Sequence, residues 1–174
     1  MHIAEGILPL SHALGWAALA SPFLGLSARH LARSLREGDG AERALLGMAG
    51  ALTFAVTLFP VPVPVAGVTS HMCATPVLAL LLGPRRMVLP AALTLLIQAV
   101  LFAHGGLTSL GANVLTLGVV GPLVGYGLAR GLRRLGLSAA WAVGMACALA
   151  DLAVYVADAG ILGLALARER SFGV

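Results

Sequence analysis

The sequence predicts an all-α fold, a polytopic transmembrane bundle of about six to seven helices. Three observations carry this prediction: 59% of the 174 residues are hydrophobic, only 10% are charged, and the mean hydropathy is +0.97. Ordinary soluble domains are about 45–50% apolar. No polar stretch is long enough to fold separately, so residues 1–174 are expected to form a single integral membrane domain.

The chain carries a net charge of +4, and all eleven of its basic residues are arginines. A basic chain can indicate a nucleic-acid partner. These arginines, however, lie in short segments between apolar runs, a placement typical of membrane topology signals. We therefore expect no nucleic-acid partner.

Five apolar runs are long enough to cross a bilayer, for which a helix needs about 20 residues. They cover residues 10–29, 44–63, 87–104, 111–130, and 139–160 or beyond. A shorter run at about 72–84 is counted as a further helix, because the arginines at its far end require another crossing. The last run is long enough for one tilted helix, although Asp158-Ala159-Gly160 could break it.

The arginine positions predict the orientation. One group lies between the first two runs, a second follows the short run, and a third follows the run at 111–130. These are Arg29, Arg33, Arg36 and Arg43; Arg85 and Arg86; and Arg130, Arg133 and Arg134. The alternate loops, at about 62–71 and 104–110, contain no Lys or Arg. By the positive-inside rule the arginine loops are cytoplasmic and the N-terminus is outside. The orientation of the C-terminus stays open.

Small residues recur every fourth position on the first two runs. Ala13, Ala17, Ser21 and Gly25 form one stripe, and Gly47, Ala51 and Ala55 form another. Such stripes allow helices to approach closely. They are expected to serve internal packing, or, on the first run, to dock a second membrane protein.

The N-terminal dipeptide Met1-His2 has the composition of a metal chelate. The Met1 amine, the His2 backbone nitrogen and the His2 imidazole can close two fused rings around one cation, and such planar nitrogen coordination suits Ni(II) and Cu(II). A fourth donor is then needed. No basic region precedes the first apolar run, so we expect no removable signal peptide and an N-terminus that stays attached.

Two further histidines lie on the predicted outer side. His71 follows Pro60, Pro62 and Pro64, which are expected to hold the chain extended. Its imidazole is either simply solvated or the missing fourth donor. His104 begins a loop whose glycines permit close backbone approach. That loop is either a capped turn or a scaffold that braces the metal loop, with Gln98 and Asn113 as further hydrogen-bonding candidates.

The remaining polar residues have simpler explanations. His12 is expected to be solvated or to support the N-terminal loop, and Glu5 to cap the N-terminal segment or to neutralise a cation. Asp151 lies deep in the last run, where a charge is costly, and is expected to be paired within the bundle. Cys73 and Cys147 are expected to be buried thiols. HExxH, GxSxG and Walker motifs are absent, which argues against an enzyme and against ATP use by this chain alone.

Six segments of the chain form a distinctive combination: Met1-His-Ile-Ala-Glu-Gly-Ile-Leu-Pro9, Thr69-Ser-His-Met-Cys-Ala-Thr-Pro76, Leu82-Gly-Pro84, Ala103-His-Gly-Gly-Leu-Thr-Ser-Leu-Gly-Ala-Asn113, Gly121-Pro122 and Ala150-Asp-Leu-Ala-Val-Tyr155. Together they resemble the CbiM/NikM family, the substrate-capture (S) components of energy-coupling-factor importers for cobalt and nickel. The similarity covers nearly the whole chain in order.

The resemblance implies that the external N-terminus folds inward and that the metal is held by the Met1 amine, the His2 amide and imidazole nitrogens, and the His71 imidazole. It also implies a transmembrane coupling (T) component, a pair of cytoplasmic ATPases, an accessory small membrane subunit in some complexes, and a place in the inner membrane. Co(II) or Ni(II) would be the transported substrate, with no redox or organic cofactor.

The sequence departs from the family pattern at its C-terminal end, where members usually have a further helix. The chain is either a shorter variant or receives that helix from elsewhere. The alternatives considered for function are an S component for an organic micronutrient, a haem-binding membrane subunit, and a purely structural membrane subunit. The residues do not separate cobalt from nickel, since planar nitrogen coordination favours nickel whereas Glu5 and the His104 loop are closer to cobalt-type members.

Overall fold

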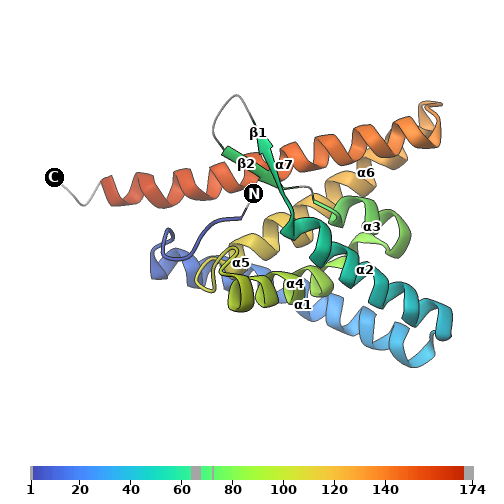
Figure 1. Ribbon diagram of the computed structural model, residues 1–174, viewed down its shortest axis with the longest axis horizontal. Helices are drawn as coiled ribbons and strands as arrows, with labels where there is room; N and C mark the ends of the chain where they lie inside the picture. The colour runs from blue at the N-terminus through green and yellow to red at the C-terminus, as the bar shows by residue number, and fades with distance from the viewer. Residues whose placement is uncertain (1, 64–67, 72, 171–174) are drawn as a thin grey trace.

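The computed structural model describes residues 2–63, 68–71 and 73–170, and these residues form a bundle of helices with one short hairpin (Figure 1). In chain order the elements are α1 (Leu10–Glu37), α2 (Gly40–Leu58), β1 (Pro60–Val63), β2 (Val68–His71), α3 (Thr75–Leu82), α4 (Pro84–Phe102), α5 (Leu110–Asn113), η1 (Val114–Val120), α6 (Gly121–Arg134) and α7 (Ala139–Arg170). The predicted helical bundle is confirmed. The hairpin is an addition to the all-α prediction.

Helix α1 is longer than its predicted span of 10–29. It continues to Glu37, so Arg29, Arg33 and Arg36 lie on its last turns and not in a loop. Arginine is a good helix former, which allows the helix to extend beyond its apolar stretch. A short turn follows, and the Asp39 carboxylate accepts the backbone N–H of Glu42 at 2.8 Å to cap α2.

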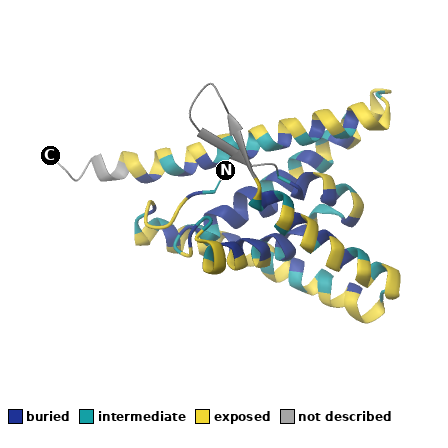
Figure 2. Cartoon of the chain, in the orientation of Figure 1, coloured by how far each residue is buried: buried dark blue, intermediate teal, exposed yellow. Residues whose placement is uncertain are grey.

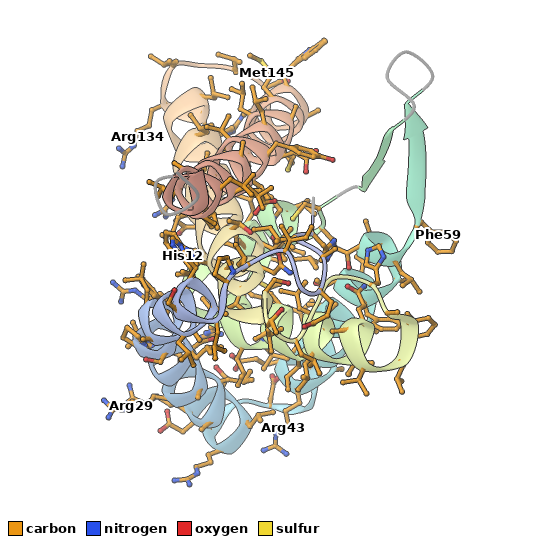
Figure 3. All side chains as sticks on the ribbon, turned by 90° about the vertical axis from the view of Figure 1, so that its left-hand side faces the viewer. His12, Arg29, Arg43, Phe59, Arg134 and Met145 are labelled. Atoms are coloured by element: carbon orange, nitrogen blue, oxygen red, sulfur yellow. The ribbon has the colours of Figure 1, made fainter. Side chains whose placement is uncertain are left out.

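Helix α2 ends earlier than the predicted span of 44–63. It stops at Leu58, because Pro60 and Pro62 have no N–H to continue the helix. The chain then forms β1, as the predicted extended conformation requires, and β1 pairs with β2 in an antiparallel hairpin. In this register Pro60 is opposite His71, so His71 lies at the base of the hairpin next to the end of α2. Figure 3 shows the hairpin standing away from the bundle beyond Phe59.

Helix α3 confirms the short helical run, but its eight residues do not cross a bilayer alone. At 1.5 Å per residue it is about 12 Å long, against roughly 30 Å of hydrocarbon. Most of its side chains are buried, including Thr75 and Leu78, and the Thr75 hydroxyl donates to the Leu117 carbonyl at 2.6 Å. Gly83, with φ of 85°, ends α3 and lets α4 begin at once.

The segments α5, η1 and α6 form one continuous helical path from Leu110 to Arg134 with a π-helical middle. Residues 114–119 of this middle part are all buried. Helix α7 follows as a single helix of 32 residues, and Asp158-Ala159-Gly160 does not break it. Its described end lies on the same side of the bundle as the start of α1 (Figure 1).

The exterior of the bundle is largely apolar, as expected for a membrane protein. Figure 2 shows buried residues along the inner faces and exposed residues along the outer faces. The exposed residues include Leu101, Trp141 and Leu152, which are 58–71% exposed. Within the described residues, four helical stretches are long and apolar enough to cross a membrane: Gly40–Leu58, Pro84–Phe102, Leu110–Arg134 and Ala139–Ala167. Helix α1, which carries His12 and three arginines, is not among them.

Nine of the eleven arginines lie toward one end of the bundle, whereas Arg168 and Arg170 belong to the last turn of α7 at the opposite end. The end of α1 and the start of α2 are joined by a short turn, and Arg86 at the start of α4 forms an ion pair with Glu42 of α2 at 2.7 Å. The junction of α6 and α7 also lies toward this end (Figure 1). Arg29, Arg43 and Arg134 point outward from the bundle (Figure 3). The N-terminal segment and the loop after α4 lie at the opposite end.

Candidate metal centre

The N-terminal segment before α1 is tied to the loop after α4 through the backbone of Ile3. The side-chain amide of Asn113 contacts this backbone twice, accepting the Ile3 N–H at 2.9 Å and donating to the Ile3 carbonyl at 3.1 Å. The Ser109 hydroxyl donates to the same carbonyl at 2.5 Å. Ile3, Ser109 and Asn113 are at most 2% exposed. The residue after His2 is therefore held by buried, satisfied hydrogen bonds, which are costly to break.

A second set of contacts holds the next turn of the segment. The Glu5 carboxylate accepts the backbone N–H groups of Leu107 and Thr108, and the Gly6 N–H donates to the Thr108 hydroxyl at 3.3 Å. Hydrogen bonds from the Thr108 hydroxyl and the Thr108 backbone lower the pKa of Glu5. Glu5 thus caps the contact between the N-terminal segment and the loop, the first of the two roles considered for it.

The glycines of this loop permit the close approach that the sequence predicted. A Cβ atom on Gly106 would lie 2.6 Å from the Glu5 Cα, so no larger residue fits there without moving the N-terminal segment. Gly105, with φ of 84°, has the His2 side chain 3.5 Å from its Cβ position. Glycine is therefore required at two consecutive positions, one for space and one mainly for backbone conformation.

His2 lies directly against His104. The two imidazole rings meet edge to face, with centroids 4.5 Å apart. The backbone carbonyl of Thr57, at the end of α2, accepts a hydrogen bond from His104. Burial is the largest cause that lowers the pKa of His104, which favours its neutral form. His104 thus connects the N-terminal segment to α2.

Gln98 stabilises the end of α2, where His104 makes its contact, from inside the bundle. It is fully buried, and its amide nitrogen donates to the Phe54 carbonyl at 3.1 Å and to the Thr57 hydroxyl at 2.9 Å. The hydrogen bonds of its side chain are to α2, whereas the side chain of Asn113 bonds to the N-terminal segment. Of the two predicted supporting residues, Asn113 contacts that segment directly and Gln98 supports the end of α2 that carries the hairpin.

The hairpin register places the His71 backbone beside the end of α2, and the Thr57 carbonyl there meets His104. His2, His104, Asn113 and the backbone of His71 are therefore gathered at one end of the bundle. Met1 lies outside the described residues. Among those that are described, no three His, Cys, Asp or Glu side chains form a metal-binding group.

Other polar residues singled out by the sequence lie apart from this cluster. His12 is on α1, and its buried Nε2 has no hydrogen-bond partner in the described part of the chain. The same holds for Oδ1 of Asp151, so the pairing expected for that carboxylate is not found at this oxygen. Cys73 and Cys147 are unpaired thiols of intermediate exposure. Sequence reasoning missed Ser109 and Thr108, because a serine or threonine in a loop is too common to mark a contact.

A small cavity of about 290 Å³ lies beside the first residues. His2, Ile3 and Ile7 line one wall, and Tyr155, Asp158 and Leu162 of α7 line the other. Ile3 and Leu8 also pack against Ile161 and Ala165 of α7. The N-terminal segment is therefore enclosed by the loop after α4 on one side and by α7 on the other.

Comparison with known proteins identifies relatives along the whole chain. A family model described as CbiM, cobalt uptake substrate-specific transmembrane region, matches residues 2–174. A cobalt transport protein CbiM of Sorangium cellulosum is 44% identical over 172 residues, which are 98% of this chain and 76% of the relative. The CbiM of Geobacter sulfurreducens is 45% identical over 91% of this chain, which spans only 46% of that relative's length.

Solved structures agree with the sequence relatives. A crystal structure of a truncated transition metal transporter superimposes with a TM-score of 0.83 at 32% identity, covering 94% of this chain and 75% of the other. A second transition metal transporter gives a TM-score of 0.84 at the same identity, with 70% of its chain covered. The predicted resemblance is confirmed, and the chain belongs to the CbiM family of cobalt-uptake transmembrane proteins.

Proposed function

We propose that this protein is the metal-capture (S) component of an ATP-driven energy-coupling-factor importer for Co(II) or Ni(II). The observation that carries the proposal is the anchored N-terminal segment, in which Ile3 and Glu5 are bound to the loop after α4 while His2 lies against His104. An N-terminus held in this way, in a family described by cobalt uptake, suits the capture of a single cation.

The proposed ligands are the Met1 amine, the His2 amide and imidazole nitrogens, and the His71 imidazole. Four nitrogens in a plane are suited to Ni(II), and imidazole binds Co(II) as well. The register that puts His71 opposite Pro60 supports its inclusion, because it brings the His71 backbone to the end of α2 next to the His104 contact. Gln98, His104 and Asn113 position these donors without binding the metal.

Partner proteins would supply the energy for transport. The chain lacks a Walker motif, so a transmembrane coupling component and two cytoplasmic ATPases would drive transport, in some complexes with a small accessory membrane subunit. The protein would lie in the inner membrane with its N-terminus outside. It would have no enzymatic activity of its own.

Isothermal titration of the purified protein with NiCl₂ and CoCl₂ tests the ligand set. His2→Ala, His71→Ala and extension of the N-terminus by two residues should each reduce the affinity at least 100-fold, because each removes or displaces a donor. His30→Ala, on α1 near the arginine-rich end, serves as the control and should bind like the wild type. Undiminished binding in any of the first three variants contradicts the proposed site.

X-ray absorption of the loaded protein gives a direct measure of the coordination. Four nitrogen donors in a plane are expected, whereas sulfur donors or a six-coordinate oxygen shell would exclude the proposed ligands. Because the amine, the amide and both imidazoles must be deprotonated to bind, the affinity should also fall as the pH is lowered.

A further inference from the structure

The cavity beside the N-terminal segment contains an ionisable group that the proposed ligand set does not use. Asp158 lines it from α7, opposite His2 and Ile3. The side chain is 7% exposed, although it belongs to one of the four helical stretches apolar enough to cross a membrane. A carboxylate so placed is costly unless a compensating charge is nearby.

The described residues provide little compensation for Asp158. Neither carboxylate oxygen has a hydrogen bond of normal geometry there, and no cation forms an ion pair with it. The Thr116 hydroxyl approaches this carboxylate, but it also donates to the Asn113 carbonyl at 3.3 Å. An unsatisfied buried acid beside a cavity is a common mark of a binding function.

Packing contacts join the part of α7 that carries Asp158 to the N-terminal segment. One turn further along α7, Ile161 packs with Ile3, which Asn113 and Ser109 bind on the other side. The N-terminal segment, the loop after α4 and α7 therefore form one packed unit. His2 and Asp158 line the same cavity within this unit.

We propose that Asp158 is the counter-charge of the captured cation. The proposal rests on the proposed function, in which a divalent cation is bound by three neutral nitrogens and one deprotonated amide nitrogen. That set leaves one uncompensated positive charge in a poorly solvated place. The Asp158 carboxylate, across the cavity and outside the ligand set, stabilises this charge and favours divalent over monovalent cations.

Asp158→Asn tests the charge without changing the size of the side chain. We expect the affinity of the purified full chain for Ni(II), measured by titration with NiCl₂, to fall about tenfold, the effect of one nearby charge in a partly buried site. The visible absorption of bound Ni(II) should stay unchanged, because the donor atoms are the same. Asp158→Glu should restore most of the affinity.

Two control variants separate charge from structure. Asp151→Asn makes the same change on the same helix face, two turns and about 10 Å earlier along α7 and outside the residues that line the cavity, and should alter the affinity less than threefold. Thr116→Val removes the hydroxyl that approaches Asp158 and should have an equally small effect. An equal loss in either control, or an unchanged affinity in Asp158→Asn, overturns the counter-charge role.

Two further measurements complete the experiment: the Ni(II) absorption spectrum of Asp158→Asn and the metal affinity of His2→Ala. A changed Ni(II) spectrum in Asp158→Asn would make Asp158 a ligand and would also overturn the inference. If His2→Ala abolishes binding while Asp158→Asn has no effect, only the inference fails. If His2→Ala binds normally, the proposed function fails, whatever the result for Asp158.

Discussion

Asn113 shows how one side chain can determine the position of a whole segment. Its amide both donates to and accepts from the backbone of Ile3, as a neighbouring β-strand would, and its nitrogen also lies 3.2 Å from the Ser109 hydroxyl. Asn113 is in a helix that continues into the core. The N-terminal segment is therefore attached directly to the packed part of the bundle. Asparagine has the donor and the acceptor that this contact needs in one planar group.

Replacing Asn113 by alanine should release the N-terminal segment. The Ile3 N–H and carbonyl would lose the Asn113 amide, which costs about 1–3 kcal/mol of local stability per unsatisfied group. Hydrogen exchange of residues 3–9, measured by mass spectrometry, should accelerate by about tenfold or more. Ser109→Ala removes one contact to Ile3 and should have a smaller effect. Unchanged exchange in Asn113→Ala would show that other contacts hold the segment.

Glu5 makes the anchoring of the segment dependent on pH. Its pKa is lowered from the usual value of 4.5, chiefly by the Thr108 hydroxyl and backbone. A lowered pKa in the folded protein means that the stabilisation is complete above about 4.5 and is lost as the pH falls through the lowered value. Exchange of residues 3–9 should therefore rise in acid in the wild type. Glu5→Gln should show faster exchange at neutral pH and little further acid dependence between pH 5 and 3.

At the scale of elements, the close contact between α3 and α6 depends on Gly125. A Cβ atom there would lie 2.6 Å from the Cβ of Pro76, a residue held rigid by its ring. The small α3 can thus pack deeply enough to bury Thr75 and Leu78. A similar contact occurs where Gly111 meets the backbone of Ala17, and Ala13 is buried, so two residues of the predicted α1 stripe serve internal packing. Ser21 and Gly25 of that stripe are exposed.

Gly125→Ala should separate α3 from α6. Overpacking of this kind costs about 1–3 kcal/mol, and the thermal unfolding temperature in detergent should fall. Gly127→Ala is the matched control, because its Cβ would have no atom within 4 Å. It should raise stability by up to about 1 kcal/mol through helix propensity. Equal stability of the two variants would contradict the contact between α3 and α6.

The sequence predicted the helices better than their ends. Proline and glycine gave correct signals at Pro60 and Gly83, since both act through the local backbone. The predicted start of the arginine loop at Arg29 was wrong because arginine also favours helix, and charge alone does not end one. The π-helix η1 could not be predicted. Its hydrogen-bond pattern depends on how buried residues such as Gly118 and Gly121 pack against α3, α4 and α7.

For the candidate site, too, the sequence predicted the general placement of residues but not the contacts that depend on packing. Placing His2 and His104 on one side of the membrane followed from the arginine pattern alone. Their direct contact did not, because it depends on how the loop after α4 folds over the N-terminal segment. Asp158 was considered only as part of a helix break. A period of 3.6 residues predicts which residues share a face of α7, but not which face meets the cavity.

At the scale of the whole molecule, the gathering of nine of the eleven arginines at one end predicts the orientation in the membrane. Phe59, directly after α2, and Leu135, directly after α6, are 69% and 78% exposed. The junction of α6 and α7 lies toward the arginine-rich end of the bundle, whereas the end of α2 lies away from it (Figure 1). In a background with Cys73 and Cys147 replaced by alanine, Phe59→Cys should react with a membrane-impermeant maleimide on intact cells. Leu135→Cys should react only after permeabilisation. The reverse pattern would show that the N-terminal segment faces the cytoplasm.

The contacts of Ile3 also dictate an order of events during synthesis. Its partners Ser109 and Asn113 are 106 and 110 positions later in the chain, so the first residues to leave the ribosome cannot dock until most of the helices have been made. Closing so long a loop costs entropy, which only a largely assembled bundle offsets. The end of the chain that is made first is therefore placed among the last. In a nascent chain stopped before Ser109, the N-terminal segment should therefore be accessible to proteases.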